Sequence, residues 1–310
     1  MIYTVTLNPA LDKTVEIPNF TIDSVNRITK MRTDPGGKGI NVSKVISKLG
    51  GTSLATGILG GATGKAIQSA LEEMGLASMF HFAEGETRTN LKVVDLEGHT
   101  NTDINEPGIT VSEELLGELL KELLGKLAEG DIVVLSGSLP KGAPKDTYYT
   151  WVKACRGAGA KVILDADGEL LAEGLKASPY LIKPNNHELS GLLGKTLKTP
   201  KELEEAAKDL MAQYGIEKIV VSMGGEGALY VTKEETIYAE GLKVPVGSTV
   251  GAGDSVVAAL AVAEERKLIL EETVRLSTAT GAANVMCSGT QAAEYEVIEG
   301  LIPKVAFQRI

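Results

Sequence analysis

Short runs of β-branched and aliphatic residues alternate with helix-like segments along this chain, and this alternation constrains its fold more than any other feature. The spacing suits βαβ units, in which a helix connects two parallel strands and packs on the sheet. We expect strands at 2–7, 53–59, 131–137, 161–167, 178–184 and 217–224, and helices at 40–50, 64–75, 112–130 and 200–215. The predicted fold class is therefore α/β, with helices on both faces of a mostly parallel sheet.

Two stretches break the alternation, because they contain strand-like segments with no helix between them. The first pairs residues 13–20 with 26–33, and the second spans residues 87–105. We interpret them as a small β layer beside the main sheet that acts as a lid. Since no low-complexity linker or internal repeat separates the parts, we expect one domain over residues 1–310, with the lid segments 13–33 and 87–105 inserted in the α/β core.

Charge and composition narrow the set of partners. The formal net charge is −10, which disfavours binding to nucleic acid because such binding requires basic patches. No apolar run approaches the length of a membrane span, and the opening MIYTVTL lacks the basic region and long apolar stretch of a secretory leader. The two cysteines, Cys155 and Cys287, support neither a disulfide framework nor a zinc ribbon. We expect a cytoplasmic protein with no nucleic-acid or membrane partner.

A single carboxylate interrupts the apolar stretch STVGAGDSVVAALA at residues 248–261. Gly251, Ala252 and Gly253 precede a predicted helix over 254–266, so their backbone N–H groups can bind an anion at its positive end. Asp254 lies at the same end. It is either an N-cap that stabilises the helix or a reactive carboxylate beside the anion site, and this segment alone leaves both interpretations open.

Two familiar nucleotide-binding motifs are absent. The segment LGGATGKA at 59–66 fails as a P-loop, because Leu59 replaces the first glycine and Ala66 replaces the serine or threonine that binds magnesium. No GxGxxG sequence follows a predicted strand, so a dinucleotide fold is not supported. A nucleotide, if bound, is bound by another architecture.

The segment KPNNHE at 183–188 offers groups for a nucleotide and its metal. Lys183 can face phosphates, while Asn185 and Glu188 lie three residues apart at a helix start and can position a hydrated magnesium ion. The alternative is a capping asparagine with a first-turn glutamate, which needs no ligand.

Polar residues near the predicted lid suit a sugar that carries a phosphate. Asp12 and Asn41 are typical partners of sugar hydroxyls, and Lys38, Arg88 and Arg27 supply positive charge. A solvated lid surface is the alternative for these cations, and we prefer it for Arg27.

Taken together, these motifs resemble the two signatures of the PfkB (ribokinase-like) carbohydrate kinases. GGKGINVSKVISKLG, followed by Gly60, is similar to their N-terminal signature, and STVGAGDSVVAALA is similar to their C-terminal one. NNHE fits their NxxE motif, and SMGGEGA fits their nucleotide-side loop. The resemblance extends from residue 6 to residue 290. It implies a three-layer α/β/α sandwich with a small β lid.

The resemblance also implies roles for individual residues, with ATP and Mg²⁺ as cofactors. Asp254 would be the general base, beside an anion hole formed by Gly251, Ala252 and Gly253. The remaining positions would be Asp12, Gly37, Lys38, Asn41, Arg88, Arg27 and Ser138 for the sugar phosphate, Lys183, Ser222, Gly224, Gly227 and Asn284 for the nucleotide, and Asn185 and Glu188 for the metal.

Within that family, TLNPALD, VNR, GETR, INEPG and LSGSLPKG are most similar to members that phosphorylate the C6 hydroxyl of D-fructose 1-phosphate. Members that phosphorylate tagatose 6-phosphate share most of these motifs and remain the alternative. A non-catalytic sensor of sugar phosphates is the alternative from another functional class. Because exposed lid strands need a partner along their edges, we also expect a homodimer formed through the β lid.

Overall fold

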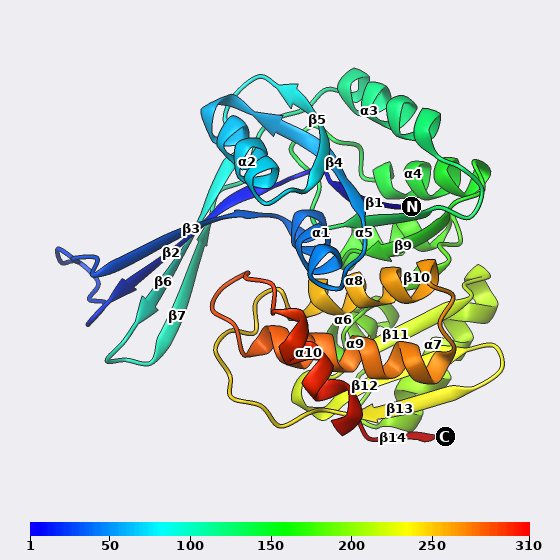
Figure 1. Cartoon of the computed structure of the whole chain (residues 1–310). Coiled ribbons are helices and arrows are strands. Elements are labelled where there is room, and N and C mark those ends of the chain that lie inside the picture. The colour runs from blue at the N-terminus through cyan, green and yellow to red at the C-terminus, as the bar shows by residue number, and fades with distance from the viewer.

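The computed structural model describes residues 1–310, and it contains the expected main sheet with helices on both faces (Figure 1). The sheet has ten strands in the order β14-β13-β12-β11-β10-β9-β8-β1-β4-β5. The strands are β1 (Ile2–Thr6), β4 (Ser53–Gly60), β5 (Ala77–Ala83), β8 (Ile132–Ser136), β9 (Lys161–Asp165), β10 (Leu181–Ile182), β11 (Lys218–Ser222), β12 (Gly227–Thr232), β13 (Thr236–Glu240) and β14 (Phe307–Arg309).

Pairing within this sheet is parallel from β5 to β11 and antiparallel from β11 to β14. The antiparallel end was not predicted from the sequence, because its strands are short and no α-helix lies between β11, β12 and β13. The predicted strand at 178–184 is reduced to Leu181–Ile182. Beyond it, Lys183 and Asn185 line the cleft described below, and the Pro184 carbonyl still accepts a hydrogen bond from the N–H of Ser222 in β11.

Two helical layers enclose the sheet. One layer contains α3 (Glu113–Lys126), α4 (Thr147–Gly157), α5 (Gly168–Leu175), α6 (Asn186–Leu193) and α7 (Pro200–Tyr214). The other contains α1 (Lys38–Lys48), α8 (Ala252–Glu265), α9 (Leu270–Val285) and α10 (Tyr295–Leu301), while α2 (Gly61–Glu73) packs near the β4–β5 edge. Short 3₁₀ turns occupy Gly224–Glu226 and Ile302–Lys304.

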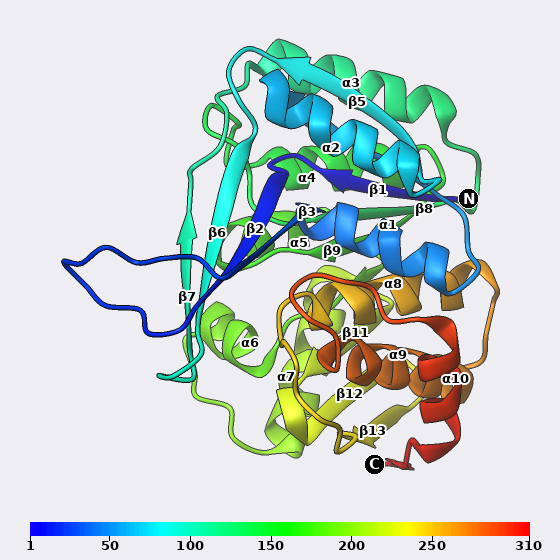
Figure 2. The ribbon, with the colours of Figure 1, turned by 60° about the vertical axis from the view of Figure 1, so that its left-hand side comes forward.

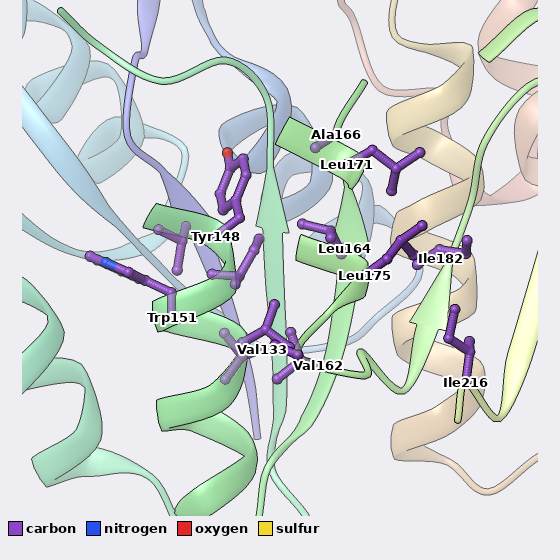
Figure 3. Packing of buried hydrophobic residues seen from close by; sticks show 14 of the residues in the cluster. Val133, Tyr148, Trp151, Val162, Leu164, Ala166, Leu171, Leu175, Ile182 and Ile216 are labelled. Atoms are coloured by element: carbon purple, nitrogen blue, oxygen red, sulfur yellow. The ribbon is translucent and has the colours of Figure 1, made fainter. Parts of the chain in front are cut away.

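Each helical layer has its own hydrophobic core, because successive side chains of a strand point to opposite faces. Val133 and Leu135 of β8 join a cluster of 35 buried residues under α3–α7, part of which is shown in Figure 3. Ile132 and Val134 join a cluster of 28 residues under α1, α8, α9 and α10. The central strands are thus apolar on both faces, as the alternation of strand and helix segments in the sequence predicted.

A second sheet of four strands projects from the main body on the side away from both termini (Figures 1 and 2). Its order is β3-β2-β6-β7, with β2 at Ala10–Ile17, β3 at Lys30–Gly36, β6 at Arg88–Asp95 and β7 at Thr100–Asn105. The first pair lies three or four residues away from the predicted positions, and residues 18–29 form an exposed connection. Only Val15, Ile17 and Val93 form its separate buried cluster.

No helix in the structure combines the length and the apolar character needed to cross a bilayer.

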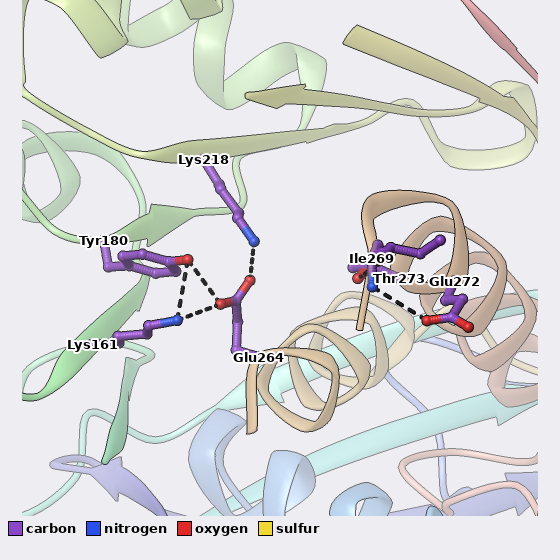
Figure 4. A network of polar contacts seen from close by, with 7 residues as sticks. All are labelled: Lys161, Tyr180, Lys218, Glu264, Ile269, Glu272 and Thr273. Carbon is purple, nitrogen blue, oxygen red and sulfur yellow. Dashed lines mark hydrogen bonds and ion pairs between the residues drawn. The ribbon is translucent and has the colours of Figure 1, made fainter. Parts of the chain in front are cut away.

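An ionic network fixes the C-terminal end of α8, beside the first residues of β9 and β11 (Figure 4). Glu264 accepts hydrogen bonds from Lys161 (2.9 Å), from the hydroxyl of Tyr180 (2.8 Å) and from Lys218. Burial alone raises the pKa of Glu264, but these donors outweigh burial and hold the pKa below its ordinary value. The network therefore anchors α8 to the starts of β9 and β11.

We expect Glu264→Gln to lower the free energy of unfolding at pH 7 by about 1–2 kcal/mol, because two ammonium groups lose their anionic acceptor and are partly screened by solvent. A lowered pKa in the folded state stabilises above the unfolded value near 4.5 and loses that effect as the pH falls. Urea unfolding at pH 7 and at low pH should therefore show a difference that disappears in acid. The exposed pair Lys145–Glu169 provides the control Glu169→Gln, and an equal loss there would contradict this account.

Candidate active site

A cleft of about 1220 Å³ lies between the second sheet and the carboxyl ends of the parallel strands. Asp12, Thr14, Asn90, Lys92 and Asp103 line it from one face of the second sheet. The register places these residues on a common face, because Asp12 pairs with Asn90 and Thr14 pairs with Lys92. Ligands of open α/β sheets bind at this edge, so the position agrees with the sequence expectation.

Asp254 occupies the first turn of α8 and is only 7% exposed. The N-cap is Gly251, with φ of 80°, and no side chain caps the helix. The carboxylate of Asp254 instead accepts a hydrogen bond from Asn41 Nδ2 at 2.8 Å. The N-cap interpretation is therefore wrong: Asp254 lines the cleft and is held by a side chain 213 residues away in sequence.

A second buried carboxylate, Asp165, lies in the same cleft and was missed in the sequence. It ends β9 and forms ion pairs with Lys38 (3.3 Å) and Lys183 (3.4 Å). Burial raises the pKa of Asp165, but the two ammonium groups outweigh it and hold the pKa low. The available signal was an acidic residue at the carboxyl end of the apolar run KVILD, where the strand meets a ligand-binding edge.

The electrostatic surroundings raise the pKa of Asp254 to about 6. Burial is the largest cause, and the negative charge of Asp165 is the next. Lys38, the hydrogen bond from Asn41 and Lys183 act in the opposite direction without cancelling the shift. A carboxylate with this pKa is mostly ionised at neutral pH, and it is a better proton acceptor than an ordinary aspartate.

The residues predicted to form the anion hole all line the cleft at the start of α8. A Cβ atom on Gly253 would lie 3.3 Å from Lys183 Nζ, so this ammonium group approaches the backbone closely. Asn284 does not line the cleft: it is 2% exposed and lies beneath the Gly251 turn, where its Oδ1 accepts a hydrogen bond from the backbone N–H of Ala293. The expectation that Asn284 contacts a nucleotide directly is therefore corrected. Asn284 instead packs under the Gly251 turn and supports it.

Asn185 and Glu188 form the capping box of α6. Asn185 Oδ1 accepts from the Glu188 N–H at 2.8 Å, and Glu188 Oε2 accepts from the Asn185 N–H at 2.9 Å. Both residues also line the cleft, as do Ser222, Gly224 and Gly227. The capping interpretation is thus confirmed, and Glu188 Oε1 has no hydrogen-bond partner within the chain. No three acidic, histidine or cysteine side chains gather closely enough to hold a metal ion.

The residues predicted for a sugar divide between two hollows. Asp12, Gly37, Lys38, Asn41 and Arg88 line the main cleft. Burial raises the pKa of Asp12, which accepts a hydrogen bond from Asn90 at 3.0 Å.

A smaller hollow of about 190 Å³ adjoins the main cleft, with which it shares Lys38 and Arg88, and it contains Ser138. Thr6 and Ser136 are also among its lining residues, but their hydroxyl oxygens are fully buried and have no hydrogen-bond partner. None of the lining residues is hydrophobic, and Lys38 and Arg88 bring positive charge, so this hollow suits a polar, anionic ligand. Arg27 lies outside both hollows, exposed on the connection between β2 and β3.

Comparison with known proteins agrees with this geometry. The chain is 40% identical over 312 residues to a 1-phosphofructokinase of Bacillus subtilis, with 100% of each chain covered. It is 38% identical to a 1-phosphofructokinase of Xanthomonas campestris, covering 97% of this chain and 98% of the relative.

Solved structures show the same fold. Phosphofructokinase-2 of Escherichia coli in complex with fructose-6-phosphate has a TM-score of 0.92 at 32% identity, covering 98% of both chains. A possible 1-phosphofructokinase of Thermotoga maritima has a TM-score of 0.88 at 30% identity, covering 100% of this chain and 99% of that one. The model of the pfkB family carbohydrate kinases matches residues 6–296. The resemblance seen in the sequence is confirmed, and the chain belongs to the pfkB family of carbohydrate kinases.

Proposed function

We propose that this protein is an ATP-dependent 1-phosphofructokinase, which transfers a phosphoryl group to the C6 hydroxyl of D-fructose 1-phosphate. The observation that carries the proposal is the position of Asp254, a buried carboxylate with a pKa of about 6 that adjoins three backbone amides at the start of α8. Curated relatives that span nearly the whole chain and carry the name 1-phosphofructokinase support the same activity.

The mechanism follows from the charges in the cleft. Asp254 takes the proton of the sugar hydroxyl as its oxygen attacks the γ-phosphorus of ATP, and the bond to the β-phosphate oxygen breaks to release ADP. The N–H groups of Gly251, Ala252 and Gly253 stabilise the charge on the transferring group. Lys38 and Lys183, which pair with Asp165 in the structure, lie close enough to provide the positive charge that the phosphates need.

Nucleotide and metal would be bound on the side of the cleft formed by α6 and β11–β12. Ser222, Gly224 and Gly227 line this side of the cleft and would lie along the phosphates and ribose, and Lys183 would face the phosphates. Glu188, with its free Oε1, and Asn185 fit a magnesium ion that keeps water and phosphate oxygens as its other ligands. Magnesium would supply charge neutralisation for the phosphate chain.

The phosphate already present on the sugar would occupy the smaller hollow. Lys38 and Arg88 provide its positive charge, and the hydroxyl of Ser138 provides a hydrogen bond. Asp12, Gly37 and Asn41 would orient the sugar between this hollow and Asp254. A plain sugar would leave the two cations of this hollow without an anion, so the geometry favours a phosphosugar.

Tagatose 6-phosphate is less favoured than fructose 1-phosphate, since the curated relatives described above are 1-phosphofructokinases. Fructose 6-phosphate is a further candidate, because a structural relative binds it. A sensor without activity would not need a buried base whose charge lowers the stability of the fold.

The variant Asp254→Asn tests catalysis and stability together. We expect it to lose nearly all ADP release over a panel of these phosphosugars while still binding ATP. A raised pKa in the folded state lowers stability as the pH increases from about 3.8 to about 6, so the neutral amide should raise the free energy of unfolding at pH 7 by roughly 2–3 kcal/mol. The gain should vanish below pH ~4. Near-normal kcat would return Asp254 to a structural role.

Arg88→Ala is the control for substrate binding in the same assay. It should raise KM for the phosphosugar strongly and leave KM for ATP nearly unchanged, because Arg88 lines the smaller hollow and lies away from the nucleotide side. Equal effects on both constants would remove Arg88 from the phosphate site. If the wild-type protein released no ADP with any phosphosugar, the sensor would be the better account.

We further propose that the second sheet is a lid within one kinase domain and that its outer face forms a homodimer. The cleft-facing side of the sheet is polar, whereas Met31 (58% exposed) and Ile104 (52% exposed) point to the other side. Ile22 and Val25 on the adjacent connection are 86% and 80% exposed. Such an apolar surface is typical of an interface. Arg27, on the same connection, would then lie at or near the partner subunit.

Light scattering tests the dimer. The wild-type protein should have the mass of two chains at micromolar concentration, and Met31→Glu combined with Ile104→Glu should give a folded monomer because two charges would be buried at the interface. A wild-type monomer, or an unchanged mass for the variant, would remove this interface.

A further inference from the structure

One side chain of the second sheet crosses to the segment that follows α9. Arg32 lies on β3, where its Nε donates to Asp34 Oδ2 at 2.7 Å and its Nη2 donates to the backbone carbonyl of Ser288 at 2.8 Å. Arg32 and Ser288 are 256 residues apart in sequence. Figures 1 and 2 show the connection after α9 beside the base of the second sheet.

The close approach depends on Gly289. A Cβ atom at this position would lie 2.1 Å from Arg32 Nη2, and the backbone φ of 59° is one that glycine adopts without strain. An alanine would therefore push the guanidinium away from the Ser288 carbonyl, so the sequence of the loop is matched to this contact.

Lys44 of α1 forms a second link between β3 and the same loop. Its ammonium group is buried and donates to the carbonyl of Pro35, at the end of β3, at 2.9 Å and to the carbonyl of Thr290 at 3.0 Å. Burial lowers the pKa of Lys44, and the neighbouring carboxylates oppose this effect. A buried donor is costly to leave unpaired, so this bridge keeps Thr290 in place against the end of β3.

The Ser288–Thr290 loop lies directly under the turn that carries the proposed anion hole. A Cβ atom on Gly251 would lie 3.5 Å from Asn284 Nδ2 and 3.9 Å from Thr290 Cα. The carbonyl of Val285 accepts hydrogen bonds from the N–H groups of Gly247 and Ser248, at the base of the same turn. The segment 284–293 is thus in contact with the Gly251 turn on one side and with β3 on the other.

Few other contacts can fix the second sheet relative to this segment. Its buried cluster of Val15, Ile17 and Val93 belongs to the sheet itself and is separate from both large cores. Burial of apolar surface therefore contributes little to the placement of the sheet against the loop, and specific polar contacts carry more of it.

We propose that Arg32 is a positioning residue for phosphoryl transfer, which acts through the Ser288 carbonyl and, together with the Lys44 bridge, holds the Gly251–Asp254 turn in its reactive geometry. This inference rests on the proposed kinase function. Arg32 does not line the cleft, so its effect reaches the reacting groups through the loop. The second sheet and the proposed anion hole are then held in register by the Arg32 contact and the Lys44 bridge.

The test compares Arg32→Met with Lys30→Ala. Lys30 is on the same strand and face, and it pairs only with Glu16 of the neighbouring strand. Losing a charge-assisted hydrogen bond that orders the turn should lower kcat of Arg32→Met roughly 10- to 100-fold, with KM for both substrates within about threefold. Lys30→Ala should keep wild-type kcat. A purely structural role would instead lower the thermal midpoint and leave kcat unchanged, and that result would overturn the proposal.

Gly289→Ala perturbs the same contact from the other side. It should lower kcat at least as much as Arg32→Met, because an alanine also strains the backbone at φ 59°. Its further effect in the Arg32→Met background should be smaller than its effect in the wild-type protein, because the contact is already lost there. Independent, multiplied losses would show that the two residues do not act together and would overturn the proposal.

Hydrogen exchange separates this inference from the kinase assignment. In Arg32→Met, amides of segments 247–253 and 284–293 should exchange faster than in the wild-type protein and in Lys30→Ala. If exchange is faster in Arg32→Met but the wild-type protein has no kinase activity, the link between β3 and the turn stands and only the proposed kinase function fails. Unchanged exchange in both segments would overturn the link, whatever the activity.

Discussion

The active cleft depends on the mutual neutralisation of two buried carboxylates and two ammonium groups. Asp254 and Asp165 would each be too costly to bury alone, and the nearby positive charges of Lys38 and Lys183 offset part of that cost. Each group comes from a different element at the carboxyl edge of the sheet, so the sheet order and the starts of α1 and α8 must be correct before the cluster can form. The charged cluster of the cleft can therefore form only in the completed fold.

The same charges explain why one aspartate suits a base and the other does not. Asp165 receives both lysines directly, which keeps its pKa low, whereas Asp254 has only the amide of Asn41 as a direct partner. Burial and the charge of Asp165 therefore raise the pKa of Asp254 toward the pH at which the enzyme would act. At the opposite end of α8, Glu264 has the reverse environment, with donors that hold it ionised and fix the helix.

Sequence reasoning located most of this cleft because its pieces are short motifs with local physics. Glycines before a helix predict an anion site, and the structure places Gly251–Asp254 at the start of α8, where they line the cleft. Asp165 was missed because it belongs to no motif, and its importance arises only when β9 lies beside β10 and the start of α1. Arg32 was missed for the same reason, since its partner is a backbone carbonyl 256 residues away. The N-cap alternative for Asp254 and the cleft position of Asn284 could only be resolved in three dimensions.

The central claim is that Asp254 is the base and that Asp165 helps to set its pKa. The most direct measurement is the pH dependence of kcat/KM for fructose 1-phosphate, in the wild-type protein and in Asp165→Asn. We predict an acidic limb near pH 6 in the wild type that moves to lower pH in the variant, because the variant loses the repelling charge beside Asp254. The second ionisation of a phosphate also lies near pH 6, but it would not move with the protein. A limb at the same pH in both proteins would contradict the account.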